Sequence, residues 1–167
     1  RLSTGQWAAV VSGGYNNTYD NDSNNNDSTS GNAVLYIVDI KDGSLIKKFD
    51  TQKGMAEDPD VLNRPNGLAT PIVIDVEGDY IVDIIYAGDL FGNVWKIDIS
   101  STDSDDWGFS YISTSKPQPL YTACIGENCA TSSYQPITSK IEVRRHPTSA
   151  GYLLSFGTGK YIEVGQQ

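Results

Sequence analysis

Short apolar runs separated by glycine-bearing turns extend along this chain. The clearest runs are residues 34–40 (VLYIVDI), 84–87 (IIYA) and 94–99 (VWKIDI). They are rich in β-branched and aromatic side chains, as strands are, and almost no segment has a helical period. Residues 44–49 follow the turn Lys41-Asp42-Gly43 as a partner for the first run. The pattern therefore predicts an all-β fold.

The strand pattern recurs. Residues 94–99 repeat the aromatic, apolar and Asp order of residues 34–40 roughly sixty positions later. A third unit extends from Ile141 through residues 152–156 to residues 160–162. Antiparallel units of this kind form the blades of a β-propeller, which closes with about four to eight blades. We therefore predict that residues 1–167 are a single fragment, about three blade-like units, of a propeller in a longer parent protein. A β-sandwich is the alternative.

A polar insertion occupies residues 15–31, where Asn, Asp and Ser dominate. We predict a surface loop between two strands, because such a segment has nothing to bury. A second calcium loop is an alternative there, although a bias toward Asn and Asp produces the required spacing by itself. Its ligands would be Asp20, Asp22, Asn24 and Asp27.

Charge and hydropathy narrow the function classes. The net charge is -9, from 12 basic and 21 acidic residues, and no basic stripe is present to neutralise nucleic-acid phosphates. No apolar run approaches the roughly 20 residues of a membrane span. We expect no nucleic-acid partner and no transmembrane segment. Asp103, Asp105 and Asp106 are interpreted as part of a solvated loop.

The acidic residues of segment 75–83 have the spacing of a calcium loop. Calcium takes six to eight oxygen ligands, which alternating carboxylates in one short segment supply. The candidate ligands are the side chains of Asp75, Glu77, Asp79 and Asp83, at positions one, three, five and nine, and the backbone carbonyl of Ile81 at position seven. The segment therefore predicts a calcium ion that clips a connection between strands. A plain polar turn at Gly78-Asp79 is the alternative.

The two cysteines, Cys124 and Cys129, enclose a short loop. An even cysteine count in an exported protein predicts a disulfide, with free buried thiols as the alternative. Zinc needs two further ligands, and His146 is the only histidine. His146 lies between Arg145 and Pro147, in an expected turn, so no Ser-His-Asp arrangement is evident. We interpret the chain as non-enzymatic.

Several phrases of the sequence resemble a known family. They are residues 7–15 (WAAVVSGGY), 32–51 (NAVLYIVDIKDGSLIKKFDT), 68–99 (LATPIVIDVEGDYIVDIIYAGDLFGNVWKIDI), 135–138 (QPIT) and 156–161 (FGTGKY). Together they resemble the C-terminal propeller of the type IV pilus biogenesis and tip-adhesin proteins of the PilY and PilC type. The run YAGDLFGNVWKID is the most specific element, and the similarity spans nearly the whole chain.

This resemblance implies a modified propeller, exported to the outer membrane, the pilus tip or the cell surface of a Gram-negative bacterium. It implies calcium in the 75–83 segment, where the ion modulates pilus extension against retraction and so twitching motility. The implied partners are pilins, minor pilins and host surface ligands. Two positions depart from the family pattern, since Glu77 replaces a shorter Asp or Asn and Tyr80 replaces a glycine.

Two other classes of protein are alternatives. The run LYIVDIKDGSLIKKFD is similar to the repeat of quinoprotein dehydrogenases, which are propeller enzymes. Those enzymes use an adjacent cysteine pair and a stacking Trp, whereas Cys124 and Cys129 are separated here. We expect Trp7, Trp95 and Trp107 to pack within blades. The 75–83 segment is also similar to a structural calcium repeat of the integrin type.

Overall fold

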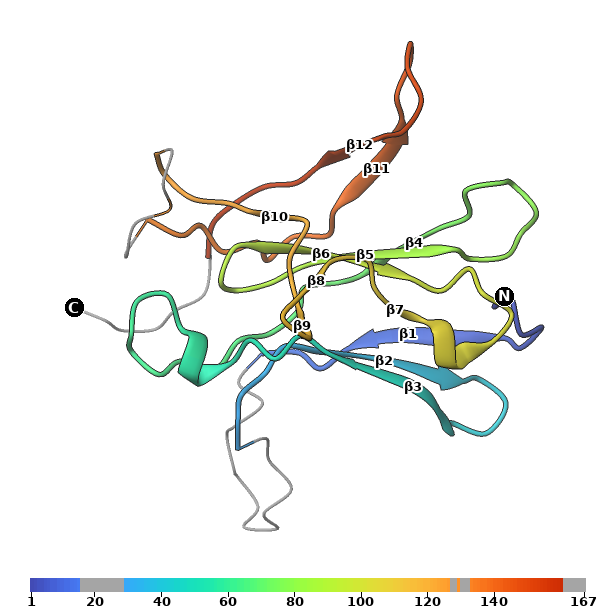
Figure 1. The fold of residues 1–167 in the computed structure, drawn as a ribbon, viewed down its shortest axis with the longest axis horizontal. Coiled ribbons are helices and arrows are strands. Elements are labelled where there is room, and N and C mark those ends of the chain that lie inside the picture. Colours follow the sequence, from blue (N-terminus) through green and yellow to red (C-terminus); the bar gives the residue numbers. More distant parts are fainter. Residues whose placement is uncertain (16–28, 127–128, 130–132, 161–167) are drawn as a thin grey trace.

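The computed structural model describes residues 1–15, 29–126, 129 and 133–160. It is built from short antiparallel strands in three successive units, with two single-turn 3-10 helices, η1 (Met55–Glu57) and η2 (Ser104–Asp106). The predicted all-β class is confirmed. Figure 1 shows the units one above another, with the β11–β12 hairpin projecting from the body.

The first unit is a three-stranded meander. It consists of β1 (Ala8–Ser12), β2 (Val34–Asp39) and β3 (Leu45–Asp50), in the order β1-β2-β3. The predicted strand at 34–40 and its partner at 44–49 correspond to β2 and β3. The tight turn between them places Gly43 at φ 76°, and Asp39 accepts a hydrogen bond from the N–H of Lys41 (2.8 Å). The 15–31 insertion connects β1 to β2, but its candidate ligands at 20, 22, 24 and 27 lie outside the described residues.

The second unit is the largest sheet, and the third unit is a smaller hairpin that packs beside it. The sheet has the order β10-β6-β5-β4, and β7 also pairs with β6. The bounds are β4 (Ile72–Ile74), β5 (Ile84–Gly88), β6 (Asn93–Asp98), β7 (Gly108–Phe109) and β10 (Tyr121–Thr122). The third unit is the hairpin β11 (Glu142–Arg145) and β12 (Tyr152–Ser155), and a separate small hairpin joins β8 (Ile112–Ser113) to β9 (Lys116–Pro117).

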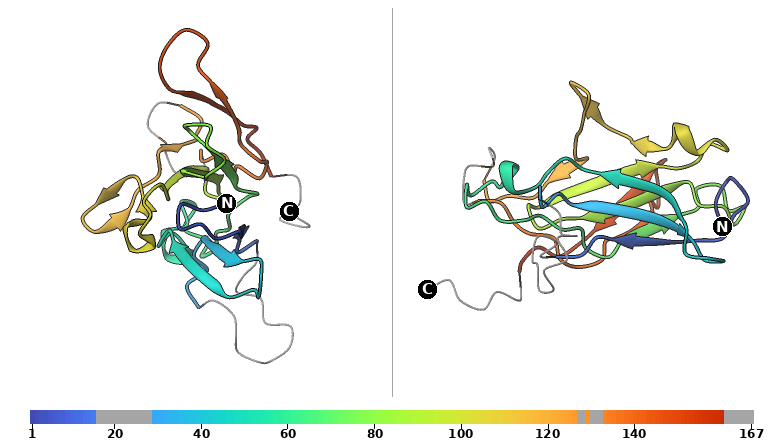
Figure 2. Two further views of the ribbon diagram at one scale, coloured as in Figure 1. Left: turned by 90° about the vertical axis from the view of Figure 1, so that its right-hand side faces the viewer. Right: turned by 90° about the horizontal axis from the view of Figure 1, so that it is seen from below.

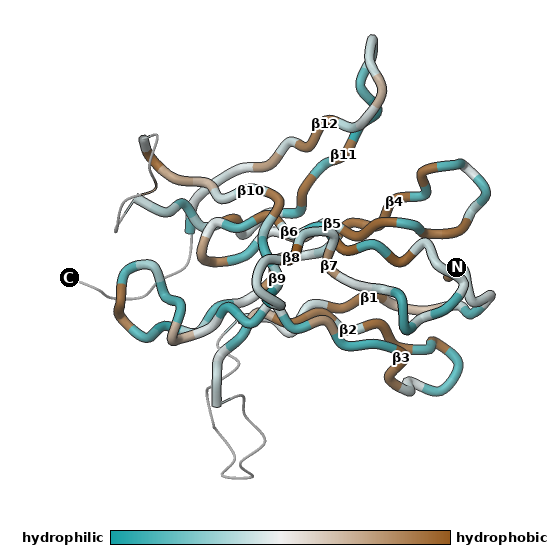
Figure 3. The backbone as a smooth tube through the Cα atoms, in the orientation of Figure 1, coloured by the Kyte–Doolittle hydropathy of each residue, from teal (hydrophilic) through white to brown (hydrophobic). Residues whose placement is uncertain are grey.

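Two apolar clusters hold the three units together. One lies between the first and second sheets, where Leu35 and Ile37 of β2 meet Ile85 of β5 and Trp95 of β6. The other covers the opposite face of the second sheet, where Tyr86 and its neighbours pack against the β11–β12 hairpin. Because side chains alternate along a strand, β5 contributes Ile85 to one cluster and Tyr86 to the other. Figures 2 and 3 show this layering and the apolar strands at its centre.

The first sheet carries exposed apolar side chains at one end of its outer face. Trp7 is 64% exposed, and Ile40 and Leu45 are 61% and 58% exposed. Trp95 and Trp107 are buried as expected, so Trp7 is the exception among the three tryptophans. Trp7 precedes β1, and its carbonyl accepts a hydrogen bond from the N–H of Ile40 (3.1 Å), which brings the two exposed side chains to the same end of the sheet.

A fully buried aspartate organises the turn between β5 and β6. Asp89 has no solvent exposure and accepts five hydrogen bonds. Its Oδ1 receives the backbone N–H groups of Phe91 and Asn93, and its Oδ2 receives the side chains of Asn66, Asn93 and Trp95, all at 2.8–3.0 Å. Burial raises the pKa of Asp89, and the hydrogen bonds from Asn93, Asn66 and Trp95 oppose that rise. The sequence analysis identified the flanking runs 84–87 and 94–99 but not this buried carboxylate.

Candidate metal centre

The 75–83 loop joins β4 to β5 at one end of the second sheet, where Ile74 pairs with Ile84. Its trailing end is tied to the sheet, because the N–H of Asp83 donates to the carbonyl of Ile74 (2.9 Å) and the carbonyl of Asp83 accepts from Ile99 (2.8 Å). The middle of the loop is exposed (Figure 1), and Tyr80 reaches 88% exposure. All five predicted ligand residues therefore lie on one anchored, solvent-facing connection, as the sequence predicted.

Asp75 folds the first half of the loop around its own carboxylate. Oδ1 accepts the N–H groups of Gly78 (2.6 Å) and Asp79 (3.3 Å), and Oδ2 accepts the N–H of Tyr80 (2.7 Å). Desolvation raises the pKa of Asp75, but these N–H groups outweigh it and lower the pKa below its ordinary value. The carboxylate is therefore held in its charged form, which is the form that a cation requires.

Tyr80 adopts the backbone conformation of the glycine that it replaces. Its φ is 67° and that of Gly78 is 84°, so both residues lie in the left-handed region. A side chain in this region carries some strain, which the hydrogen bond from the N–H of Tyr80 to Asp75 offsets. The departure at position six leaves the loop with a sharp bend.

The other carboxylates of the loop are less engaged. Asp79 accepts the N–H of Ile81 (2.8 Å), and Asp83 accepts the N–H of Val76 (2.7 Å). No ion pair joins any of the four acidic side chains to a cationic group in the described chain. Nor do three or more acidic, His or Cys side chains converge as a metal cluster among the residues described. The loop thus holds four carboxylates that form no ion pair in the described chain and do not converge on one point.

The donor set fits a hard divalent cation. Every candidate ligand atom is an oxygen, and four of the groups carry negative charge. In the part of the chain that the structure describes, none of the four forms an ion pair with a lysine or arginine, although Arg145 donates to the Val76 carbonyl of the same loop. Calcium tolerates high coordination numbers and irregular geometry, so a flexible acidic loop suits it better than it suits magnesium. Asp75, Glu77, Asp79 and Asp83, with the carbonyl of Ile81, are the residues that would hold the ion.

The remaining sequence candidates lie elsewhere. Cys124 and Cys129 are joined by a disulfide in the structure, with their Cα atoms 5.2 Å apart. His146 stands at the end of β11, where its Nδ1 accepts the N–H groups of Thr148 (3.3 Å) and Ser149 (3.0 Å) and so shapes the hairpin turn. Asp103 begins η2 and accepts the N–H of Asp105 (2.9 Å). These contacts give His146 and Asp103 local structural roles.

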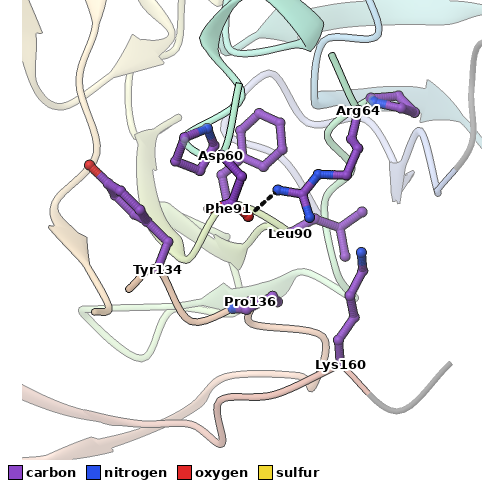
Figure 4. A pocket seen from close by; sticks show the side chains of 9 residues that line it. Asp60, Arg64, Leu90, Phe91, Tyr134, Pro136 and Lys160 are labelled. Atoms are coloured by element: carbon purple, nitrogen blue, oxygen red, sulfur yellow. Dashed lines mark hydrogen bonds and ion pairs between the residues drawn. The ribbon is translucent and has the colours of Figure 1, made fainter. Parts of the chain in front are cut away.

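A second acidic loop carries an ion pair that the sequence analysis missed. Asp58 is buried and accepts hydrogen bonds from the guanidinium of Arg64, at 2.8 and 3.0 Å, and from three backbone N–H groups. Burial raises the pKa of Asp58, but these donors outweigh it and lower the pKa to about 2. Figure 4 shows Arg64 also facing Asp60 beside a small pocket, with Phe91 and Tyr134 on its wall. The pair braces the loop from 58 to 64.

Comparison with known proteins shows which family the chain resembles. Residues 1–166 match the family model described as the PilY1 beta-propeller domain. The chain is 39% identical over 166 residues to the type IV pilus biogenesis factor PilY1 homolog of Xylella fastidiosa, covering 96% of this chain and 10% of that protein. It is 38% identical over 181 residues to the type IV pilus biogenesis factor PilY1 of Pseudomonas aeruginosa, covering 98% of this chain and 14% of that protein.

A solved structure agrees with the sequence relatives. The crystal structure of the Pseudomonas aeruginosa PilY1 C-terminal domain matches with a TM-score of 0.74 and 31% identity, over 98% of this chain and 31% of that one. No helix in the described residues has the length and apolar character needed to cross a membrane. The propeller resemblance inferred from the sequence is confirmed, and the chain belongs to the PilY1 beta-propeller domain family.

Proposed function

We propose that this chain is a non-enzymatic, calcium-binding part of a type IV pilus biogenesis propeller, exported to the outer membrane or pilus tip. Calcium in the 75–83 loop would modulate pilus extension against retraction, with pilins and minor pilins as partners and host surface ligands as further ones. The relatives support the pilus context, since they are named as type IV pilus biogenesis factors. The same names favour a pilus role over the quinoprotein alternative.

The observation that carries the calcium assignment is the charge state of the loop. Asp75 is held ionised by backbone N–H groups and, with Glu77, Asp79 and Asp83, has no cationic partner among the described residues. Like charges confined to one short loop repel each other unless a cation joins them. Calcium would therefore order this loop more than any other part of the chain.

The loop is better placed to act as a calcium-dependent switch than as a structural staple, by which we mean a metal site that the fold requires for its stability. β5 and β6 contribute Ile85, Trp95 and Ile97 to an apolar cluster that needs no metal, and among residues 75–83 only Val82 packs against it. An empty loop then leaves the blade folded, while a filled loop gains order.

We further propose that residues 1–167 are one part of a larger propeller ring. The second sheet has apolar neighbours on both faces, whereas the outer face of the first sheet, with Trp7, Ile40 and Leu45, has none in the described chain. The chain also spans 31% of the solved C-terminal domain that it matches. Another blade of the same ring is the expected neighbour of that face.

The functional test uses Asp79→Ala in the full-length parent protein, in cells. The proposal predicts normal β circular dichroism for the purified variant together with altered piliation and twitching. Loss of the β signal would mean that calcium is a staple, and a folded variant with unchanged pili would refute the switch. Asp98→Ala is the matched control, because Asp98 is an exposed aspartate at the end of β6 whose carboxylate accepts hydrogen bonds only from Ser100 among the described residues.

A further inference from the structure

The β11–β12 hairpin is attached to the rest of the chain at two places. At its base, Val143 and Leu154 pack on the apolar cluster that covers the second sheet. In its outer half, residues 144–153, every hydrogen bond to another element of the described chain ends on the carbonyl of Val76. Arg145 Nη2 donates to that carbonyl at 2.7 Å, and Tyr152 Oη lies 3.5 Å from it. The carbonyl of Val76 is thus the hydrogen-bond acceptor through which the outer half of the hairpin is joined to the 75–83 loop.

Arg145 and Tyr152 act as a pair. They are directly opposite each other in the β11–β12 register, and the next bond outward, from the N–H of His146 to the carbonyl of Gly151 (2.9 Å), closes the turn. A contact that holds both strands at the same level restrains the exposed turn beyond it. Figure 1 shows that this turn projects away from the sheets, on the same side as the 75–83 loop.

Val76 connects this contact to the candidate ligands. Its carbonyl accepts from Arg145, while its N–H donates to Oδ2 of Asp83 at 2.7 Å. Val76 also follows Asp75 directly in the chain. A cation that draws the carboxylates of Asp75 and Asp83 together must therefore change the hydrogen bond between the Val76 N–H and Asp83. The same change fixes or moves the Val76 carbonyl, to which Arg145 is bonded.

We infer that the β11–β12 hairpin is the element that responds to calcium binding, an inference that rests on the calcium site proposed above. The contact of Arg145 and Tyr152 with the Val76 carbonyl transmits the state of the loop to the hairpin. In the empty loop, mutual repulsion of the carboxylates lets Val76 fluctuate and loosens the outer half of the hairpin. In the filled loop, Val76 is held in place and the hairpin becomes ordered. Arg145 is thus a positioning residue, and calcium changes the order of an exposed surface.

Hydrogen exchange measured by mass spectrometry tests this coupling. The chain is compared with and without calcium chloride, with magnesium chloride as the ion control, and exchange is followed in peptides from the 75–83 loop and from residues 142–155. We expect calcium to slow exchange in both segments saturably and over the same concentration range, by about fivefold or more in the hairpin. In Arg145→Ala the loop should still respond, whereas the hairpin response should be lost.

Arg144→Ala is the matched control. Arg144 is the neighbouring residue on β11, its side chain is 81% exposed, and it pairs with Glu142 at 3.8 Å without contacting the loop. This variant should retain the hairpin response. Tyr152→Phe, which removes only the weaker contact, should reduce the response less than Arg145→Ala does. Calcium affinity is a poor readout here, because removing Arg145 removes both a cation that repels calcium and a brace that orders the loop.

The outcomes separate the coupling from the calcium site. Slowed exchange in the loop with an unchanged hairpin would overturn the coupling and leave the calcium site standing. An equal hairpin response in wild type and in Arg145→Ala would overturn the role of Arg145. No saturable response in the loop would overturn the calcium site, and the coupling with it.

Discussion

Replacing Asp89 by Asn should destabilise the chain strongly, although the two side chains have nearly the same size. The carboxylate has no solvent exposure and accepts five hydrogen bonds. An amide has only one acceptor oxygen. Whichever way it is turned, its NH2 group faces either the backbone N–H groups of Phe91 and Asn93 or the three side-chain donors on Asn66, Asn93 and Trp95.

The magnitude follows from the donors left without an acceptor. At least two buried N–H groups lose their partner, and each costs about 1–3 kcal/mol. Rotating the side chain of Asn66 or Asn93 does not restore balance, because the Oδ1 of Asn66 accepts from Gly67 (2.9 Å) and that of Asn93 from Thr122 (2.9 Å). The neutral amide avoids the burial cost that raises the pKa of Asp89, which offsets part of the loss. We expect a net loss of about 3 kcal/mol.

Urea unfolding followed by tryptophan fluorescence measures this loss, because Trp95 is fully buried beside Asp89. For an m-value of about 2 kcal/mol per molar urea, the midpoint should fall by about 1.5 M. Asp98→Asn is the control, since Asp98 is exposed and should shift the free energy of unfolding by less than about 1 kcal/mol. A midpoint shift for Asp89→Asn no larger than that of the control would refute this account of the turn.

Three further predictions concern the rest of the chain. The pKa of Asp58 is about 2 against an ordinary 3.8, so its contacts contribute about 2 kcal/mol of stability above about pH 4 that is lost as the pH falls toward 2. Arg64→Met should flatten that part of the stability–pH curve, and an unchanged acid transition by circular dichroism would contradict it. Trp7→Ser should reduce self-association of the isolated chain in sedimentation experiments but destabilise a longer propeller, and the opposite pattern would remove the blade-packing proposal. Thiol counting in denaturant should find Cys124 and Cys129 oxidised in protein exported to an oxidising compartment, and two free thiols there would disprove the disulfide prediction.

The longer strands were predictable because each carries its own signal. Residues 34–40 and 84–87 correspond to β2 (Val34–Asp39) and β5 (Ile84–Gly88), since a run of β-branched side chains beside a turn is a local pattern. β4 (Ile72–Ile74) is also β-branched, but three residues are too short a run to identify a strand by itself, and its pairing with β5 defines it. The two-residue strands β7 to β10 were missed for the same reason.

The candidate site also has parts that the local sequence could predict and parts that it could not. All five predicted ligand residues fall on one loop because they lie within nine consecutive residues, 75–83, and their spacing alone was enough to group them. The contact between Arg145 and Val76 joins residues 69 positions apart, and the bond from Asn66 to Asp89 spans 23 positions. Nothing in the local sequence marks such pairs. Asp89 lies between the two predicted strands 84–87 and 94–99, and its burial depends on the distant Asn66 and on the packing of Trp95.

Calorimetric titration of calcium into the chain decides whether the 75–83 loop binds the ion. We expect saturable binding of one calcium ion at or below millimolar concentration, with much weaker binding of magnesium. Asp75→Ala and Asp79→Ala should each weaken binding by about tenfold or more, and Asp98→Ala should leave it unchanged. Absence of saturable heat at millimolar calcium, or wild-type affinity in Asp75→Ala, would show that the 75–83 loop is only a polar turn.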